Sequence, residues 1–183
     1  MKLHNFNSGP SILPAPVLKQ AAEAVLNYKN TGLSLLEIGH RTPWFLEILD
    51  EARNAVKELM QLDDSYEVLF LHGGATTQFM QVPMNLLDSH AMAAYCDNGV
   101  WGNKAWKEAS LFGKVDIVSD GSGSQYRSIP KNIEVPNDAA YLHFTSNNTV
   151  EGTQWHQYPE TSVPLVADMS SDIFSRPAPY NTL

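Results

Sequence analysis

The sequence predicts an α/β fold in which a mainly parallel sheet is flanked by helices. Short apolar runs alternate with helical patterns along the chain, which is typical of parallel sheets whose strands are connected by helices. Polar, glycine-rich segments follow several of these runs, as expected where strands end at a ligand-binding edge. The 183 residues, 43% hydrophobic and 17% charged, suffice for one domain with a sizeable core.

The first third of the chain predicts a loop followed by two helices. Residues 1–14 are rich in Asn, Ser, Gly and Pro and are expected to form a loop. Residues 17–28 predict a helix with prolines near its first turn. Thr42 is placed to cap a second helix that begins at Pro43. Apolar residues then recur every three or four positions as far as Leu59, which predicts one buried helix face.

The remaining two thirds predict alternating strands and helices. The predicted strands are residues 68–71, 91–96, 115–118, 139–144 and 165–168. The first of these is a continuous apolar run, which is typical of a strand covered on both faces. The predicted helices are residues 75–87, which Pro83 should kink or break, and residues 101–112. Residues 120–128 predict a Gly/Ser-rich loop.

Composition excludes several classes of function. The chain has 12 Lys and Arg against 20 Asp and Glu, a net charge of −8, and no basic block, which argues against a nucleic-acid partner. No apolar run is long enough to span a membrane, and the first residues lack the apolar stretch of a secretory signal. Cys96 is the single cysteine, so no intrachain disulfide can form and a cytoplasmic location is expected. With six scattered histidines, no metal site is expected.

A phosphate site is one interpretation of residues 73–77. Two glycines, an alanine and two threonines join a predicted strand to a predicted helix. Small residues let a ligand approach the backbone, and the unpaired N–H groups of the first helical turn favour an anion. The segment has neither the lysine of a Walker motif nor the glycine spacing of a dinucleotide fold. The alternative is a tight strand–helix turn capped by a threonine.

Asp168 is a second candidate because it ends a predicted buried strand. A carboxylate in that position is costly unless it is paired. One suitable partner is the protonated ring nitrogen of pyridoxal 5'-phosphate, since the pairing keeps that ring an electron sink. The alternative is an N-cap for the Ser170 and Ser171 segment.

Three further features admit two interpretations each. The Trp101 ring could stack on a flat cofactor or belong to the core. The polar cluster at residues 145–149 could bind a phenolic oxygen or a phosphate, or could form a turn. Arg41, next to His40 in a predicted loop, could bind a carboxylate or phosphate in a bidentate way, or could pair with a nearby glutamate on the surface.

Together these segments resemble the phosphoserine aminotransferases, class-V enzymes that depend on pyridoxal phosphate and have fold type I. The resemblance runs from about residue 5 to residue 177 and follows the family's order. Its segments are residues 6–14, 37–41, 72–79 with 82–87, 99–101, 147–152, 167–171 and 174–177.

The resemblance implies an enzyme of serine biosynthesis. It would transfer an amino group between L-glutamate and 3-phosphohydroxypyruvate, giving 2-oxoglutarate and O-phospho-L-serine. The same family also serves pyridoxine biosynthesis with a related phosphorylated substrate. Its members are homodimers with active sites near the subunit interface.

The resemblance also implies a role for each matching residue. In the cofactor site Ala75 and Thr76 would bind the phosphate, Trp101 would stack on the ring, Thr149 would bond the phenolic oxygen and Asp168 the ring nitrogen. In the substrate site Arg41, with His40, would bind a carboxylate or phosphate. Some relatives carry an arginine where Thr76 stands, which would contact the substrate phosphate.

The family's Schiff-base lysine has no counterpart among these residues. All eight lysines precede Asp168, so this catalytic lysine is expected beyond Leu183. The chain is therefore interpreted as the N-terminal part of the enzyme: residues 1–14 as an active-site loop, and residues 15–183 as a partial pyridoxal-phosphate-binding large domain without its C-terminal part or the small domain. Alone it is expected to be inactive, and a C-terminal fragment could be its partner. The alternative is a non-catalytic binding module that retains the phosphate site.

Overall fold

The computed structural model describes residues 3–88, 91–130 and 132–183. These residues form two compact units, the first ending at Leu69 and the second beginning at Phe70. Among the described residues, no helix is both long enough and apolar enough to cross a bilayer.

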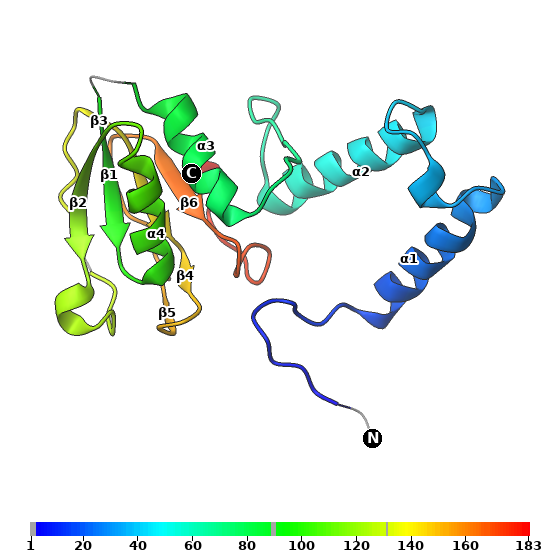
Figure 1. Cartoon of the computed structure of the whole chain (residues 1–183), viewed down its shortest axis with the longest axis horizontal. Helices are drawn as coiled ribbons and strands as arrows, with labels where there is room; N and C mark the ends of the chain where they lie inside the picture. The colour runs from blue at the N-terminus through cyan, green and yellow to red at the C-terminus, as the bar shows by residue number, and fades with distance from the viewer. Residues whose placement is uncertain (1–2, 89–90, 131) are drawn as a thin grey trace. The chain divides into compact units, whose positions relative to one another are not determined.

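The first unit is helical. Its elements are α1 (Ala15–Asn27), the 3-10 turns η1 (Tyr28–Asn30) and η2 (Leu35–Glu37), and α2 (Pro43–Met60) (Figure 1). The Thr42 hydroxyl accepts a hydrogen bond from the Phe45 N–H at 3.4 Å, which confirms the cap expected for α2. The helix ends at Met60, and the left-handed φ of 55° at the following Gln61 stops the helical hydrogen bonding.

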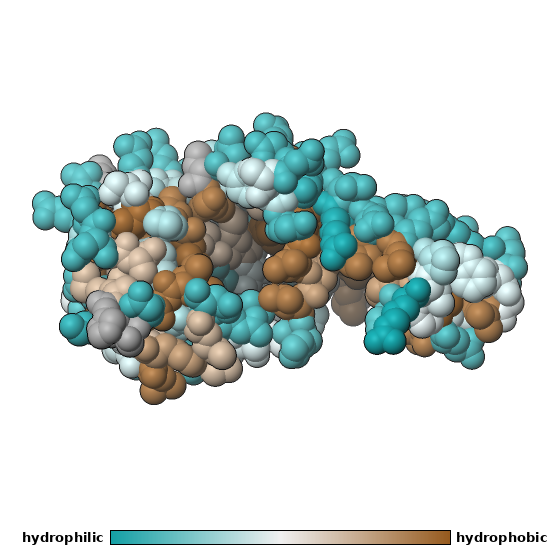
Figure 2. All heavy atoms as spheres, turned by 90° about the horizontal axis from the view of Figure 1, so that it is seen from above, coloured by the Kyte–Doolittle hydropathy of each residue, from teal (hydrophilic) through white to brown (hydrophobic). Residues whose placement is uncertain are grey.

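The helices of the first unit leave most of their apolar side chains exposed. Neither α1 nor α2 contains a buried residue, and the Leu26 side chain is 81% exposed. The brown spheres in Figure 2 mark hydrophobic residues that lie on the surface in this view. The apolar periodicity of α2 therefore marks a face that packs against little else within these 69 residues.

The second unit contains the predicted parallel sheet. Its strands are β1 (Met92–Asp97), β2 (Lys114–Asp120), β3 (Ala139–Thr145) and β6 (Leu165–Asp168). All neighbouring pairs are parallel and the order is β2-β1-β3-β6. Helices α3 (Ala75–Leu86) and α4 (Val100–Ala109) supply the flanking layer (Figure 1). An antiparallel ribbon that the sequence did not predict, β4 (Asn147–Asn148) and β5 (Thr153–Gln154), follows β3.

Both faces of this sheet carry a hydrophobic core. On the helical face, Phe79 from α3 and Ala105 from α4 pack with Tyr95 and Tyr141 from the strands. On the other face a second cluster combines strand residues with residues of the connecting segments; its buried members are Ala94, Cys96, Ala139, Leu142, Phe144, Trp155 and Val163. Ala75 and Trp101, two of the candidate site residues, pack on the helical face.

Helix α4 lies unusually close to strand β1 because Gly102 has no side chain. A Cβ atom built at Gly102 would lie 2.6 Å from the backbone carbonyl oxygen of Cys96. Since a backbone oxygen of a central strand has little freedom to move, only glycine allows this approach.

The predicted strand at residues 68–71 is wrong. The segment has no strand conformation, and Leu69, Phe70 and Leu71 are all exposed, Leu69 by 66%. A strand requires a hydrogen-bonding neighbour, and the described residues provide none for this segment. Its apolar composition therefore did not suffice to define a strand.

Pro83 does not break its helix. Helix α3 continues through Pro83 to Leu86, and the proline side chain is fully buried. The proline stands only three residues before the end of the helix, where one missing N–H removes a single hydrogen bond. The other predicted strands and helices of this unit are confirmed, with boundaries that differ by a few residues.

Candidate active site

The turn at residues 73–77 presents unpaired backbone donors at the start of α3. Gly73 has a φ of +92°, and a Cβ there would lie 2.6 Å from the Thr77 hydroxyl oxygen, so the turn requires glycine. Gly74 is the N-cap, has no side-chain cap and adjoins open space. Within the described residues, the N–H groups of Ala75 and Thr76 have no acceptor. Free donors at a helix N-terminus fit an anion such as a phosphate.

Trp101 and Thr149 are joined by a hydrogen bond. The indole Nε1–H of Trp101 donates to the Thr149 hydroxyl oxygen at 3.1 Å. Trp101 is only half-buried and packs on the core of the helical face, so the core interpretation of this ring holds in part. A threonine hydroxyl that accepts this bond still has its own proton to donate.

Asp168 has one bonded and one free carboxylate oxygen. Its Oδ1 accepts from the N–H of Ser170 at 3.1 Å and from the Ser170 hydroxyl at 2.6 Å. This contact matches the capping alternative for the residue. In the described part of the chain, Oδ2 has no hydrogen-bond partner. Asp168 can therefore maintain its local turn and accept a bond from a ligand at the same time.

The hydrophobic core brings these groups to one face of the sheet. Ala75 from α3, Trp101 from α4 and Val166 from β6 pack against the same buried cluster. Asp168 lies two residues after Val166 and therefore on the same face of β6. Its neighbour across the sheet is Thr145, at the carboxyl end of β3. The fold thus places the predicted cofactor residues of this unit around the carboxyl ends of its strands, where open α/β sheets bind ligands.

His143 is a site neighbour that sequence reasoning missed. It lies on β3, is 2% exposed, and stacks on the Tyr95 ring with centroids 4.9 Å apart. The Phe79 ring from α3 lies nearly perpendicular to the imidazole, with ring centroids 6.0 Å apart. Burial lowers the pKa of His143 to about 4, although the negative charge of Asp168 opposes this shift. The residue is therefore a neutral imidazole at physiological pH. Its alternation with Tyr141 and Thr145 along the strand was the sequence signal that could have placed it on the site face.

Asp172 was missed as well, and it connects the segments on either side of the site. It is 4% exposed and accepts hydrogen bonds from the Ser146 hydroxyl and from Gln154 Nε2, the latter at 3.1 Å. Arg176 Nη2 lies 3.7 Å from its Oδ2. Asp172 therefore ties the segment after β6 to the segment after β3. Little in the sequence indicated this role, because Asp172 follows two serines whose segment was considered only as one that Asp168 could cap.

Arg41 and His40 belong to the first unit. They are the two central residues of a turn closed by the Thr42 N–H, which donates to the Gly39 carbonyl at 3.0 Å. Both side chains are exposed, and within the described residues neither has an ion pair or hydrogen bond. The expected alternative for Arg41, pairing with a nearby glutamate, is not observed: Glu37 instead accepts from the Ser34 N–H at 2.8 Å.

Comparison with known proteins identifies the family to which this fold belongs. Residues 3–182 match the family model described as aminotransferase class-V, so the chain belongs to that family. Within it, the chain is similar to phosphoserine aminotransferases. It is 51% identical to the one from Flavobacterium johnsoniae, with 96% of this chain and 50% of the relative covered, and 46% identical to the one from Syntrophobacter fumaroxidans, with 100% and 52% covered.

Solved structures of phosphoserine aminotransferases are similar to this chain as well. A phosphoserine aminotransferase from Bacillus circulans subsp. alkalophilus is 43% identical, with a TM-score of 0.94 over 98% of this chain and 50% of that chain. The pyridoxal-phosphate-bound phosphoserine aminotransferase from Trichomonas vaginalis is 30% identical, with a TM-score of 0.84 over 96% and 50%. The fold is therefore that of the fold-type-I enzymes, and the chain spans about half the length of the relatives it matches.

Proposed function

We propose that this chain forms part of a phosphoserine aminotransferase that transfers an amino group between L-glutamate and 3-phosphohydroxypyruvate, giving O-phospho-L-serine and 2-oxoglutarate. The observation that carries the proposal is a set of polar groups on one face of the sheet that have no partner among the described residues or can still donate. They are the free N–H groups of Ala75 and Thr76, the Thr149 hydroxyl proton and the free Oδ2 of Asp168. These groups match the phosphate, phenolic oxygen and ring nitrogen of pyridoxal 5'-phosphate.

Each residue has a defined task in this proposal. The amides of Ala75 and Thr76 bind the cofactor phosphate, helped by the dipole of α3. The Trp101 ring orients the cofactor plane, Thr149 donates to its phenolic oxygen, and Asp168 keeps its ring nitrogen protonated. When bound, pyridoxal phosphate supplies an electron sink for charge that develops at the amino-acid α-carbon. Asp168 supports that function because its carboxylate stabilises positive charge at the nitrogen.

Substrate binding and domain organisation follow the same proposal. Arg41, together with His40, binds the substrate carboxylate or phosphate, for which an unpaired guanidinium is suited. Residues 1–14 form an active-site loop and residues 15–183 part of the cofactor-binding large domain. None of the eight lysines of this sequence is assigned the Schiff-base role, because all of them precede Asp168. The assembled protein is a cytoplasmic homodimer.

An assay of the protein purified at its native length tests this function. L-glutamate, 3-phosphohydroxypyruvate and pyridoxal phosphate are supplied, and O-phosphoserine is measured by mass spectrometry. The expected result is turnover that depends on pyridoxal phosphate. Tight pyridoxal phosphate binding without turnover of this or any other amino donor would instead support a non-catalytic binding module.

A further inference from the structure

The first turn of α4 lacks a cap from its own sequence. Its N-cap is Gly99, which has no side chain to bond the free N–H groups of that turn. The missing acceptor comes from a residue 51 positions away. Glu151 Oε1 accepts a hydrogen bond from the Val100 N–H at 2.8 Å. A carboxylate in this position also interacts favourably with the positive end of the helix dipole.

A second hydrogen bond joins the same two segments. Trp101, the next residue of α4, donates to Thr149, which lies two residues before Glu151. Residues 149–152 form the tight turn between β4 and β5, which is closed by the Gly152 N–H donating to the Asn148 carbonyl at 2.8 Å. Two adjacent residues of the helix are therefore bonded to two side chains of one short turn.

The contact is also close-packed. A Cβ atom at Gly99 would lie 2.7 Å from Glu151 Oε2 and 2.9 Å from Asn148 Oδ1. Glu151 Oε2 is buried and, in the described part of the chain, has no hydrogen-bond partner. Burying a carboxylate oxygen in this way is unfavourable. The bond to Val100 and the helix dipole must offset that cost, and the arrangement serves to fix the start of α4.

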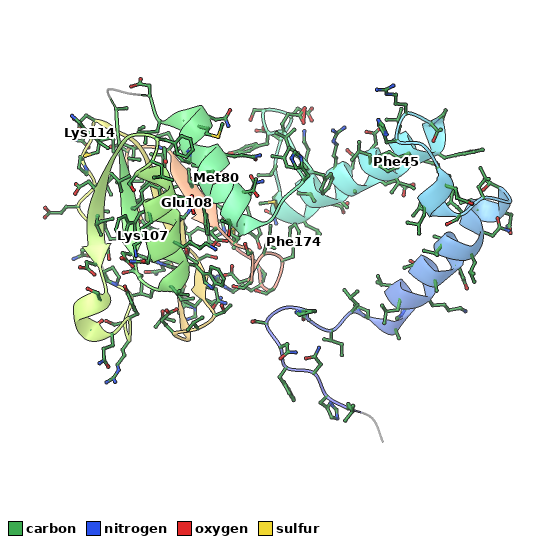
Figure 3. The ribbon with its side chains drawn as sticks, viewed as in Figure 1. Phe45, Met80, Lys107, Glu108, Lys114 and Phe174 are labelled. Atoms are coloured by element: carbon green, nitrogen blue, oxygen red, sulfur yellow. The ribbon has the colours of Figure 1, made fainter. Side chains whose placement is uncertain are left out.

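We propose that Glu151 is a positioning residue of the candidate site: its carboxylate fixes the first turn of α4, and with it the Trp101 ring, against the turn that carries Thr149. Trp101 lies at the opposite end of α4 from Lys107 and Glu108, which Figure 3 labels. Because the indole N–H occupies one lone pair of the Thr149 oxygen, the hydroxyl proton remains available to donate to the cofactor. This last step rests on the proposed function.

Two variants of Glu151 and one control test the proposal in the protein at its native length. Glu151→Ala removes the acceptor. Glu151→Gln retains an acceptor oxygen but loses the charge. Glu160→Gln is the matched control, because Glu160 is exposed and without a hydrogen bond in the described residues. The first readout is the ¹⁵N–¹H signal of the Trp101 indole, assigned with Trp101→Phe, together with its hydrogen exchange. The second is the dissociation constant for pyridoxal phosphate.

The indole of Trp106 is an internal control within the same helix. It donates to Asp97 on β1 at 2.9 Å, an acceptor other than Thr149. In Glu151→Ala, we expect the Trp101 signal to shift and its exchange to accelerate about tenfold, while the Trp106 signal stays unchanged. The dissociation constant for pyridoxal phosphate should rise about tenfold. Glu151→Gln should recover part of both losses, since neutral acceptors bond more weakly than charged ones.

Two results would overturn the proposal. One is an unchanged Trp101 signal in Glu151→Ala, and the other is a parallel change in both indoles, which would indicate general destabilisation. Failure of the proposed function is distinguishable. In that case neither the wild-type protein nor any variant binds pyridoxal phosphate. The Trp101 signal still responds to Glu151→Ala.

Discussion

In the proposed function, Asp168 combines a structural and a chemical task in one carboxylate. Its Oδ1 is engaged by Ser170, while Oδ2 has no partner in the described part of the chain. An amide can perform the first task but not the second, because only a negative charge holds a pyridine nitrogen in its protonated form. The two tasks can therefore be separated by a single substitution.

We predict that Asp168→Asn leaves the protein folded and lowers its turnover. The asparagine Oδ1 can still accept from Ser170, so the thermal unfolding midpoint should change little. Turnover should fall by at least about 100-fold, the scale typical for loss of one preorganised electrostatic contact. Steady-state kinetics and thermal unfolding measure the two effects. Turnover within threefold of wild type would show that Asp168 does not interact with the ring nitrogen.

His143 adds a pH dependence to folding stability. Its pKa in the folded protein is about 4, below the ordinary value of 6.5, so the unfolded state binds the proton more readily. The stability associated with the neutral ring is complete above about pH 6.5 and is lost as the pH falls towards 4. The shift corresponds to about 3 kcal/mol. Asp168 and Tyr95 are ionisable groups close to the ring.

Denaturant unfolding at several pH values measures this effect. His143→Phe, which retains a flat ring against Tyr95, should flatten the change in unfolding free energy between pH 6.5 and pH 4. The matched control is His156→Phe, because His156 is exposed and should leave the profile unchanged. Identical profiles for wild type and His143→Phe would show that His143 is not held neutral.

At the scale of elements, the close approach of α4 to β1 depends on Gly102. Alanine normally stabilises a helix relative to glycine by about 1 kcal/mol. Here the added Cβ would lie 2.6 Å from the Cys96 carbonyl oxygen, so the clash should outweigh the gain. We predict that Gly102→Ala lowers the free energy of unfolding by about 1–3 kcal/mol, measured by denaturant titration. Gly123→Ala, where a Cβ meets no atom within 4 Å, is the control, and equal effects of the two substitutions would refute the prediction.

The sequence predicted elements well where local pattern and capping agree. Thr42 and Pro43 located the start of α2, and residues 165–168 were predicted as the strand observed as β6. The prediction of a strand at residues 68–71 failed, because an apolar run becomes a strand only beside a neighbour that is distant in sequence. The short β4–β5 ribbon was missed for the same reason.

The candidate site was predicted through its end-of-strand residues and missed where contacts are distant. Trp101 and Thr149 were each proposed alone, but their hydrogen bond spans 48 positions. The cap that Glu151 supplies to α4 and the connections of Asp172 are equally non-local. Side chains of this kind have no signature in a local pattern, since their role arises only when the sheet brings distant segments together.

At the scale of the whole molecule, the apolar helices of the first unit imply further packing partners. Neither α1 nor α2 buries a side chain within the described residues, and the chain spans about half the length of its relatives. Exposed apolar surface of this extent is typical of faces that other protein covers. The proposed homodimer is consistent with that need.

We predict that the protein at its native length sediments as a dimer at micromolar concentration. The apolar side chains of α1 and α2 should then be protected from solvent. Analytical ultracentrifugation measures the mass, and Leu26→Glu in α1 should weaken the dimer if this face contributes to the interface. A monomer with unimpaired turnover would contradict the prediction.

The central claim is that one face of the sheet binds pyridoxal phosphate through α3, Trp101, Thr149 and Asp168. A crystal structure of the native-length protein with pyridoxal phosphate tests it most directly. The account predicts the phosphate at the N–H groups of Ala75 and Thr76, the ring against Trp101, and its nitrogen within hydrogen-bond distance of Asp168 Oδ2. A cofactor bound elsewhere, or one whose ring nitrogen lies away from Asp168, would contradict it.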